Sequence, residues 1–270
     1  MPAGILLKLF SRRVCESLLT IKKEEKRECG RLSIRKTLKV YGYVITKCVT
    51  TIPKQRKIAK KINVVQQKKE AFEFAKTVSK RTLEMLNIPL TVSGLENIPM
   101  DRPVLFVSNH QGNFDSLGLI ATSPIPISFI SKKEVRKVPI IRTWMSLMGC
   151  LFIDRKKGKS SAIAIRKTFQ QIKEKEAFVI YPEGTRSKND TMNPFKKGGL
   201  RIAYDTKITV VPVTISGSYR IMEANKWTLS PFPLSITYHP MVTPSTEMFE
   251  EYLTHIYSTI LTALPTTKHK

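Results

Sequence analysis

Acidic residues are scarce in this chain of 270 residues: 21 Asp or Glu stand against 46 Lys or Arg, which gives a formal net charge of +25. Such an imbalance predicts attraction to a polyanion, and nucleic acid and an anionic membrane surface are the two obvious candidates. The excess is concentrated in residues 1–70, which contain 19 Lys or Arg and five Glu. Because no helix-turn-helix, zinc-finger or aromatic-rich RNA-binding signature accompanies the charge, nucleic-acid binding is the weaker interpretation.

Long hydrophobic runs are also lacking. No stretch reaches the roughly 18 uninterrupted apolar residues that a membrane-spanning helix needs. The apolar run at residues 4–10 is short for a signal peptide, and basic and polar residues follow it where a cleavage site would be needed. We therefore expect a protein that is neither secreted nor membrane-spanning.

Cysteine is rare as well, with four residues in the chain. They form no C-x-x-C pair, and no Cys/His cluster has the spacing of a zinc site. Free thiols in a reducing compartment are the expected state. The remaining composition, 41% hydrophobic and 25% charged, is typical of a globular protein, and the length suffices for one large domain or two small ones.

The first third of the chain reads as basic and helical. Residues 1–33 show no core pattern, so we expect a basic, partly flexible segment there. Residues 34–88 predict a basic amphipathic helical hairpin, bent or interrupted at Pro53 and ending before Pro89. The apolar residues of its first helix recur in steps of four and three: Ile34, Leu38, Tyr41, Ile45, Cys48 and Ile52. Two interpretations are open, because such a helix can lie in a membrane interface or can pack on its own domain with a solvated basic face.

After Pro89 the chain alternates apolar runs with helical patterns. The apolar runs are bounded by Pro, Gly or Asn, as strands are: Leu90–Val92, Val104–Val107, Ile127–Ile130, Leu151–Ile153, Phe178–Tyr181, Val210–Val213 and Ser235–Tyr238. Helical patterns include Ser160–Ile172, the segment after Gly198, and Thr246–Leu264. This alternation predicts that residues 89–270 form an α/β domain with a mostly parallel or mixed central sheet flanked by helices.

The stretch NHQGNFD at residues 109–115 places a histidine and a carboxylate at the end of a predicted strand, where open α/β sheets have their sites. On a regular helix the side chains of His110 and Asp115 would point about 140° apart. They can meet only if the segment is a tight turn, which Gly112 favours. In that geometry Asp115 fixes the tautomer of His110, and His110 takes a proton from a substrate hydroxyl. A capped helix with a satisfied histidine is the alternative.

The stretch YPEGTRS at residues 181–187 also follows a predicted strand. It brings a flexible glycine and hydroxyl groups together with Arg186, whose guanidinium suits a phosphate. Glu183 has two interpretations: it contributes to substrate binding, or it pairs with Arg186 and orients it. Two further blocks occur at strands, GCLFIDR at residues 149–155, which ends in Arg155, and the apolar VVPVTI at residues 210–215.

Together these four blocks resemble those of the glycerolipid acyltransferase family, most closely its 1-acylglycerol-3-phosphate acyltransferases. The resemblance covers roughly residues 70–240, and its most specific parts are NHQGNFD and YPEGTRS. It implies transfer of a fatty acyl group from a thioester, on acyl carrier protein or coenzyme A, to the 2-hydroxyl of lysophosphatidic acid. It also implies that His110 is the base with Asp115 as its partner, and that Arg155 and the Glu183–Arg186 loop bind the phosphate end.

The remaining expectations follow from this resemblance. Lys132, after the strand at Ile127, is an additional candidate phosphate ligand, and Gly184 and Thr185 complete the candidate binding loop. No metal or other cofactor is expected, since His110 can act on the hydroxyl directly and backbone amides can stabilise the oxyanion. The expected partners are lysophosphatidic acid, the acyl thioester and anionic membrane lipids, without nucleic acid. The expected location is the cytoplasmic face of a membrane, with peripheral attachment.

Two features depart from the family pattern. Gly112 stands where serine is frequent, which affects the loop geometry, and the N-terminus is basic and amphipathic where many members have a clearly hydrophobic helix. The blocks do not separate acceptors, so another lysolipid is an alternative substrate. A catalytically silent membrane-surface protein with the same fold is a further alternative.

Overall fold

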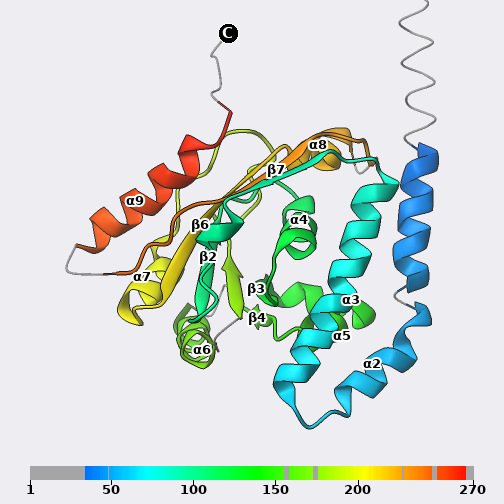
Figure 1. Cartoon of the computed structure of the whole chain (residues 1–270), viewed down its shortest axis with the longest axis horizontal. Helices are drawn as coiled ribbons and strands as arrows, with labels where there is room; N and C mark the ends of the chain where they lie inside the picture. The colour runs from blue at the N-terminus through cyan, green and yellow to red at the C-terminus, as the bar shows by residue number, and fades with distance from the viewer. Residues whose placement is uncertain are drawn as a thin grey trace, which may run out of the picture.

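The computed structural model describes residues 34–47, 49–154, 158–172, 176–226, 228–244 and 248–265 (Figure 1). The elements are, in chain order, a first helix (residues 34–47 and 49–50), α2 (Ile52–Ala59), α3 (Val64–Met85), β1 (Leu90–Ser93), η1 (Leu95–Asn97), β2 (Val104–Ser108), α4 (Phe114–Thr122), β3 (Ile127–Lys132), η2 (Lys133–Lys137), α5 (Pro139–Leu147), β4 (Leu151–Ile153), α6 (Gly158–Gln171), β5 (Ala177–Ile180), α7 (Lys197–Asp205), β6 (Thr209–Ser216), α8 (Ser218–Ile221), η3 (Glu223–Asn225), β7 (Leu234–Tyr238) and α9 (Phe249–Thr262).

The strands form one seven-stranded sheet in the order β1-β7-β6-β2-β5-β3-β4. The five neighbouring strands β6, β2, β5, β3 and β4 run parallel to one another. Strand β7 pairs antiparallel with β6 and parallel with β1. The predicted mostly parallel or mixed sheet is confirmed, and so are all seven predicted strands. Because parallel strands end at the same edge, the segments after β2, β5 and β6 leave the sheet side by side.

Alternate residues of the central strands face two separate cores. Val104 and Phe106 of β2 belong to a core shared with α3, α4 and α5, and Leu105 and Val107 belong to one shared with α6, α7 and α9. Figure 1 shows these two groups of helices on opposite faces of the sheet. A strand that is buried on both faces needs apolar residues at every position, which is why Val104–Val107 is a continuous apolar run.

The N-terminal helices share the first of these cores. Val40 of the first helix, Ile58 of α2 and Phe72 of α3 are all buried in it. Pro53 lies in the first turn of α2, so the chain bends there and begins a new helix, as predicted. The boundary expected near residue 89 stays a prediction, and the segment expected at residues 1–33 lies outside the described residues.

The first helix packs on the body through a different face from the one marked by its apolar spacing. Thr37 and Val40 are buried, and the Thr37 hydroxyl oxygen accepts a hydrogen bond from the Leu229 amide at 2.8 Å. The spacing-marked face is exposed instead: Ile34, Leu38 and Ile45 have 54%, 66% and 62% of their surface in solvent. The helix thus has two apolar faces, and the more hydrophobic one points outward. Within the described ranges, no helix has both the length and the hydrophobicity needed to cross a bilayer.

Candidate active site

The turn between β2 and α4 brings the predicted base and carboxylate together. Strand β2 ends at Ser108 and α4 begins at Phe114, so the intervening residues are not helical. In this turn the His110 ring Nδ1 lies 2.7 Å from Asp115 Oδ2. The geometric prediction is therefore confirmed: the pair meets because the segment departs from a regular helix. A helix does follow, but it starts after His110, and within this described segment its N-cap residue Asn113 makes no side-chain capping hydrogen bond.

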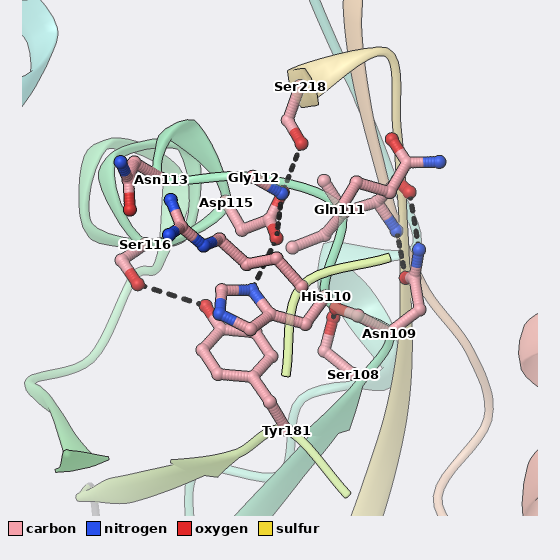
Figure 2. Close-up of polar contacts among 12 residues, drawn as sticks. Ser108, Asn109, His110, Gln111, Gly112, Asn113, Asp115, Ser116, Tyr181 and Ser218 are labelled. Atoms are coloured by element: carbon pink, nitrogen blue, oxygen red, sulfur yellow. Dashed lines mark hydrogen bonds and ion pairs between the residues drawn. The ribbon is translucent and has the colours of Figure 1, made fainter. Parts of the chain in front are cut away.

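Asp115 is fully buried and accepts hydrogen bonds from three donors (Figure 2). Its Oδ2 accepts from His110 Nδ1 and, at 2.9 Å, from the backbone N–H of Gly112. Its Oδ1 accepts from the Ser218 hydroxyl at the start of α8. An ionised carboxylate only accepts hydrogen bonds, so three converging donors match it. Since Nδ1 carries the proton that His110 donates, the lone pair of the imidazole is on Nε2.

Tyr181, the first residue after β5, forms a flat platform for the imidazole. Figure 2 shows the two rings stacked on each other. Their centroids are 4.0 Å apart and their planes differ by 13°. The Tyr181 hydroxyl lies 3.1 Å from the Ser116 hydroxyl on α4. Burial raises the pKa of Tyr181 well above its ordinary value, and the nearby Asp115 carboxylate acts in the same direction. The phenol is therefore neutral, and it restricts the orientation of the His110 ring without competing for its proton.

Two side chains anchor this turn to β6. The Asn109 amide donates to the Ile215 carbonyl and accepts from the Ile215 N–H, both at 2.8 Å. The Gln111 side-chain oxygen accepts from the Gly217 N–H at 2.9 Å. All of these groups are buried, where an unpaired polar group would be costly. The backbone around His110 is therefore fixed on both sides.

The YPEGTRS loop binds the same turn directly. The Ser187 N–H donates to the His110 carbonyl at 2.8 Å, and the Lys188 N–H donates to the Gln111 carbonyl at 3.2 Å. The Glu183 carboxylate accepts two hydrogen bonds, one from the His110 N–H at 2.6 Å and one from the Asn193 N–H at 2.9 Å. The two most specific sequence blocks thus form one structural unit.

One of the two interpretations of Glu183 made from the sequence needs correction. Glu183 does not orient Arg186, because Arg186 Nη1 pairs instead with Glu223 Oε1 at 2.9 Å. Glu183 is buried with one carboxylate oxygen on each of two backbone amides, so it supports the loop, and its contribution to substrate binding stays a prediction. Burial raises the pKa of Glu183, against the opposing effect of the two backbone amides.

The other predicted binding residues have varied surroundings. Arg186 is partly buried beside the turn, Thr185 is exposed, and Gly184 has a φ of 72°, a backbone conformation that glycine adopts readily. Lys132 is exposed at the carboxyl end of β3. Strands β2, β5 and β3 are parallel neighbours, so their carboxyl ends lie at the same edge of the sheet. Lys132 therefore lies at the same sheet edge as the His110 turn. Arg155 lies outside the described residues.

Sequence reasoning missed Ser218 and Glu223, which both follow β6. Ser218 obeys the rule that found the other blocks, since it is a polar residue just after a buried strand. Glu223 carries no such signal, because it belongs to an irregular segment and reaches Arg186 across 37 positions of sequence.

Comparisons with known proteins agree with this architecture. Residues 89–216 match the sequence model of the family described as Acyltransferase. The chain is 37% identical over 132 residues to the chloroplastic 1-acyl-sn-glycerol-3-phosphate acyltransferase of Brassica napus, a match over 48% of this chain and 38% of that protein. It is 29% identical over 172 residues to the 1-acyl-sn-glycerol-3-phosphate acyltransferase of Borreliella burgdorferi, over 64% of this chain and 69% of that protein.

A solved structure shows the same fold. The crystal structure of the 1-acyl-sn-glycerophosphate (LPA) acyltransferase PlsC from Thermotoga maritima superposes with a TM-score of 0.77 at 24% identity, covering 87% of this chain and 95% of that one. The chain spans less than two fifths of the Brassica protein's length. The resemblance inferred from the four blocks is confirmed by the match of residues 89–216 to the Acyltransferase family model.

Proposed function

We propose that this protein transfers a fatty acyl group from a thioester to the 2-hydroxyl of 1-acylglycerol 3-phosphate, which yields phosphatidic acid for phospholipid synthesis. The observation that carries the proposal is the His110–Asp115 pair at 2.7 Å, with Arg186 on the loop that contacts the same turn. The relatives named above support the choice of acceptor. Another lysolipid remains the alternative acceptor, because the site does not itself separate the two.

The reaction follows from the tautomer that Asp115 imposes. His110 Nε2 accepts the proton of the acceptor hydroxyl while the hydroxyl oxygen attacks the thioester carbonyl carbon. The imidazolium that forms is stabilised by the buried Asp115 carboxylate. As the tetrahedral intermediate collapses, the carbon–sulfur bond breaks and Nε2 returns the proton to the departing thiolate. The nucleophile belongs to the substrate, so the site needs no enzyme serine, and acyl carrier protein and coenzyme A are both candidate donors.

The acceptor phosphate is assigned to cations at the same sheet edge. Arg186 is the first ligand, because its guanidinium suits a phosphate and its loop is bonded to the His110 turn. Lys132 is a second, and Arg155 remains a candidate from the sequence alone. Gly184 and Thr185 shape the loop that presents Arg186.

A direct assay tests the proposed reaction. The purified protein is incubated with lysophosphatidic acid and either acyl-coenzyme A or acyl-acyl carrier protein, and phosphatidic acid is quantified. His110→Ala should abolish transfer with the fold intact by circular dichroism. Unchanged transfer in that variant would exclude the mechanism, and absence of transfer by the wild-type protein with both donors would exclude the function.

We also propose peripheral attachment to the cytoplasmic face of a membrane through the outward face of the first helix. Leu38 and Ile45 are mostly exposed there, and the helix also carries Lys39 and Lys47, which suit anionic lipid headgroups. Removing residues 1–70 would delete buried core residues such as Val40 and Ile58, so point changes are the better test.

The test compares sedimentation with anionic liposomes. Leu38→Glu with Ile45→Glu should weaken binding by about tenfold or more, because two apolar side chains can no longer enter the interface. Ile163→Glu is the matched control, since Ile163 is 69% exposed on α6, which covers the opposite face of the sheet. Equal binding by all three proteins would exclude the first helix as the attachment site.

A further inference from the structure

Glu223 lies outside the four sequence blocks and contacts both the His110 turn and Arg186. It begins the short helix η3, and its side chain is 5% exposed. One oxygen, Oε1, accepts from the backbone N–H of Asn113 at 2.8 Å and from Arg186 Nη1 at 2.9 Å. The same atom therefore contacts the turn that carries His110 and the cation assigned to the acceptor phosphate.

Gly112 completes this arrangement. A Cβ atom on Gly112 would lie 2.5 Å from Glu223 Oε2 and 3.1 Å from the Tyr219 Cα, both too close for an unshifted side chain. The Glu223 carboxylate thus occupies the space that a side chain at residue 112 would need. Its Oε2 is buried and has no hydrogen-bond partner among the described residues. The position of the Glu223 carboxylate therefore depends on the absence of a side chain at residue 112.

We propose that Glu223 is a positioning residue for acceptor binding, which orients the Arg186 guanidinium relative to His110. The contact uses one of the five N–H donors of the guanidinium. Fixing the orientation of a flexible side chain before binding removes part of the entropic cost of engaging the phosphate. This inference rests on the proposed function, because it assigns the Arg186 ligand to the acceptor phosphate.

The segment that carries Glu223 is itself well supported. Ile221, two residues before Glu223, is fully buried. The backbone N–H of Asn225 donates to the Met222 carbonyl at 3.1 Å. The Tyr41 hydroxyl of the first helix donates to the Met222 sulfur at 3.6 Å. Because its backbone is braced on both sides, Glu223 can restrain Arg186 instead of following it.

The test is a double-mutant cycle on binding and turnover. Dissociation constants of short-chain lysophosphatidate are measured without acyl donor, and KM and kcat are measured with it. Glu223→Ala should raise both the dissociation constant and the acceptor KM about thirtyfold, with kcat changed less than about threefold. Glu223→Gln keeps the Oε1 acceptor but loses the charge, so about fivefold is expected. Glu96→Ala, which removes an exposed carboxylate, is the control.

The decisive comparison is made in the Arg186→Ala background. If Glu223 acts through Arg186, Glu223→Ala should add less than about twofold there, whereas a general structural role would keep its full effect. The inference would be overturned, with the proposed function intact, if the effects of Glu223→Ala and Arg186→Ala on binding multiplied in the double variant. A lower kcat at unchanged KM in Glu223→Ala would have the same meaning. Coupled effects on binding in a protein that transfers no acyl group would overturn the function alone. Failure of the wild-type protein to bind lysophosphatidate would overturn both.

Discussion

Asp115→Asn should slow catalysis without changing the histidine tautomer. The Gly112 N–H is a fixed donor to Oδ2, so the asparagine amide must turn its oxygen to that position. That oxygen then also accepts from His110 Nδ1, as the carboxylate does. The amide NH₂ group faces Ser218, whose hydroxyl can reverse its role and accept. All hydrogen bonds survive in this arrangement, and only the negative charge is lost.

The size of the effect follows from that charge. An imidazolium and a carboxylate about 4 Å apart attract each other by about 4 kcal/mol at an effective dielectric constant near 20. The attraction is present only after His110 has taken the proton, so its loss raises the barrier of the proton-transfer step. About 4 kcal/mol corresponds to a decrease of about a thousandfold in kcat. The acceptor KM should change little, because Asp115 is fully buried and does not reach the substrate.

Steady-state kinetics with lysophosphatidic acid test the rate, and ¹⁵N NMR of labelled histidine tests the tautomer. Asp101→Asn is the control, because Asp101 is exposed and forms an ion pair with the adjacent Arg102. A decrease in kcat below about tenfold would mean that the carboxylate charge is not used. A proton found on Nε2 of neutral His110 in the variant would refute the hydrogen-bond argument.

Three further predictions concern the surroundings of the site. Ser218→Ala should lower kcat about tenfold, because the buried carboxylate loses one hydrogen bond; an unchanged kcat would contradict this. Glu183→Gln places an NH₂ group against a backbone N–H, and a cost of about 2 kcal/mol should lower Tm by about 4–8 °C in calorimetry. A Tm within about 1 °C of wild type would refute it. Burial lowers the pKa of His239, so its contribution to stability is present above the unfolded pKa of about 6.5 and is lost as pH falls through the folded value. His239→Asn should therefore flatten the pH dependence of the urea-unfolding free energy just below that pH, and an identical profile would exclude the effect.

The strands were predictable from the sequence because each is an apolar run with clear ends. Strand order was not, because the pairing of β2 with both β5 and β6 depends on contacts between distant segments. The antiparallel placement of β7 has the same origin. Periodicity also selected the more hydrophobic face of the first helix, whereas tertiary packing uses the face of Thr37 and Val40. A local pattern reports which faces are apolar, and it does not report which face meets the core.

The site was predictable where its partners are close in sequence. His110 and Asp115 lie within one turn, so spacing alone gave a testable geometric condition. The predicted pairing of Glu183 with Arg186 was wrong because the partners of Glu183 are backbone amides, which almost every residue has and which leave no trace in a sequence. The pairing of Arg186 with Glu223 required the fold to be known, since the intervening segment passes through α7 and β6.

The backbone hydrogen bonds that join Ser187 and Lys188 to the His110 turn have a consequence for partial unfolding. Segments that share such bonds open together, as one cooperative unit with a single opening free energy. The amide protons of His110, Ser187 and Lys188 should therefore exchange with deuterium at a common rate set by that opening. A conformer that releases the loop would lose the orientation of the imidazole in the same step. Heat or denaturant would then abolish turnover before the sheet itself melts.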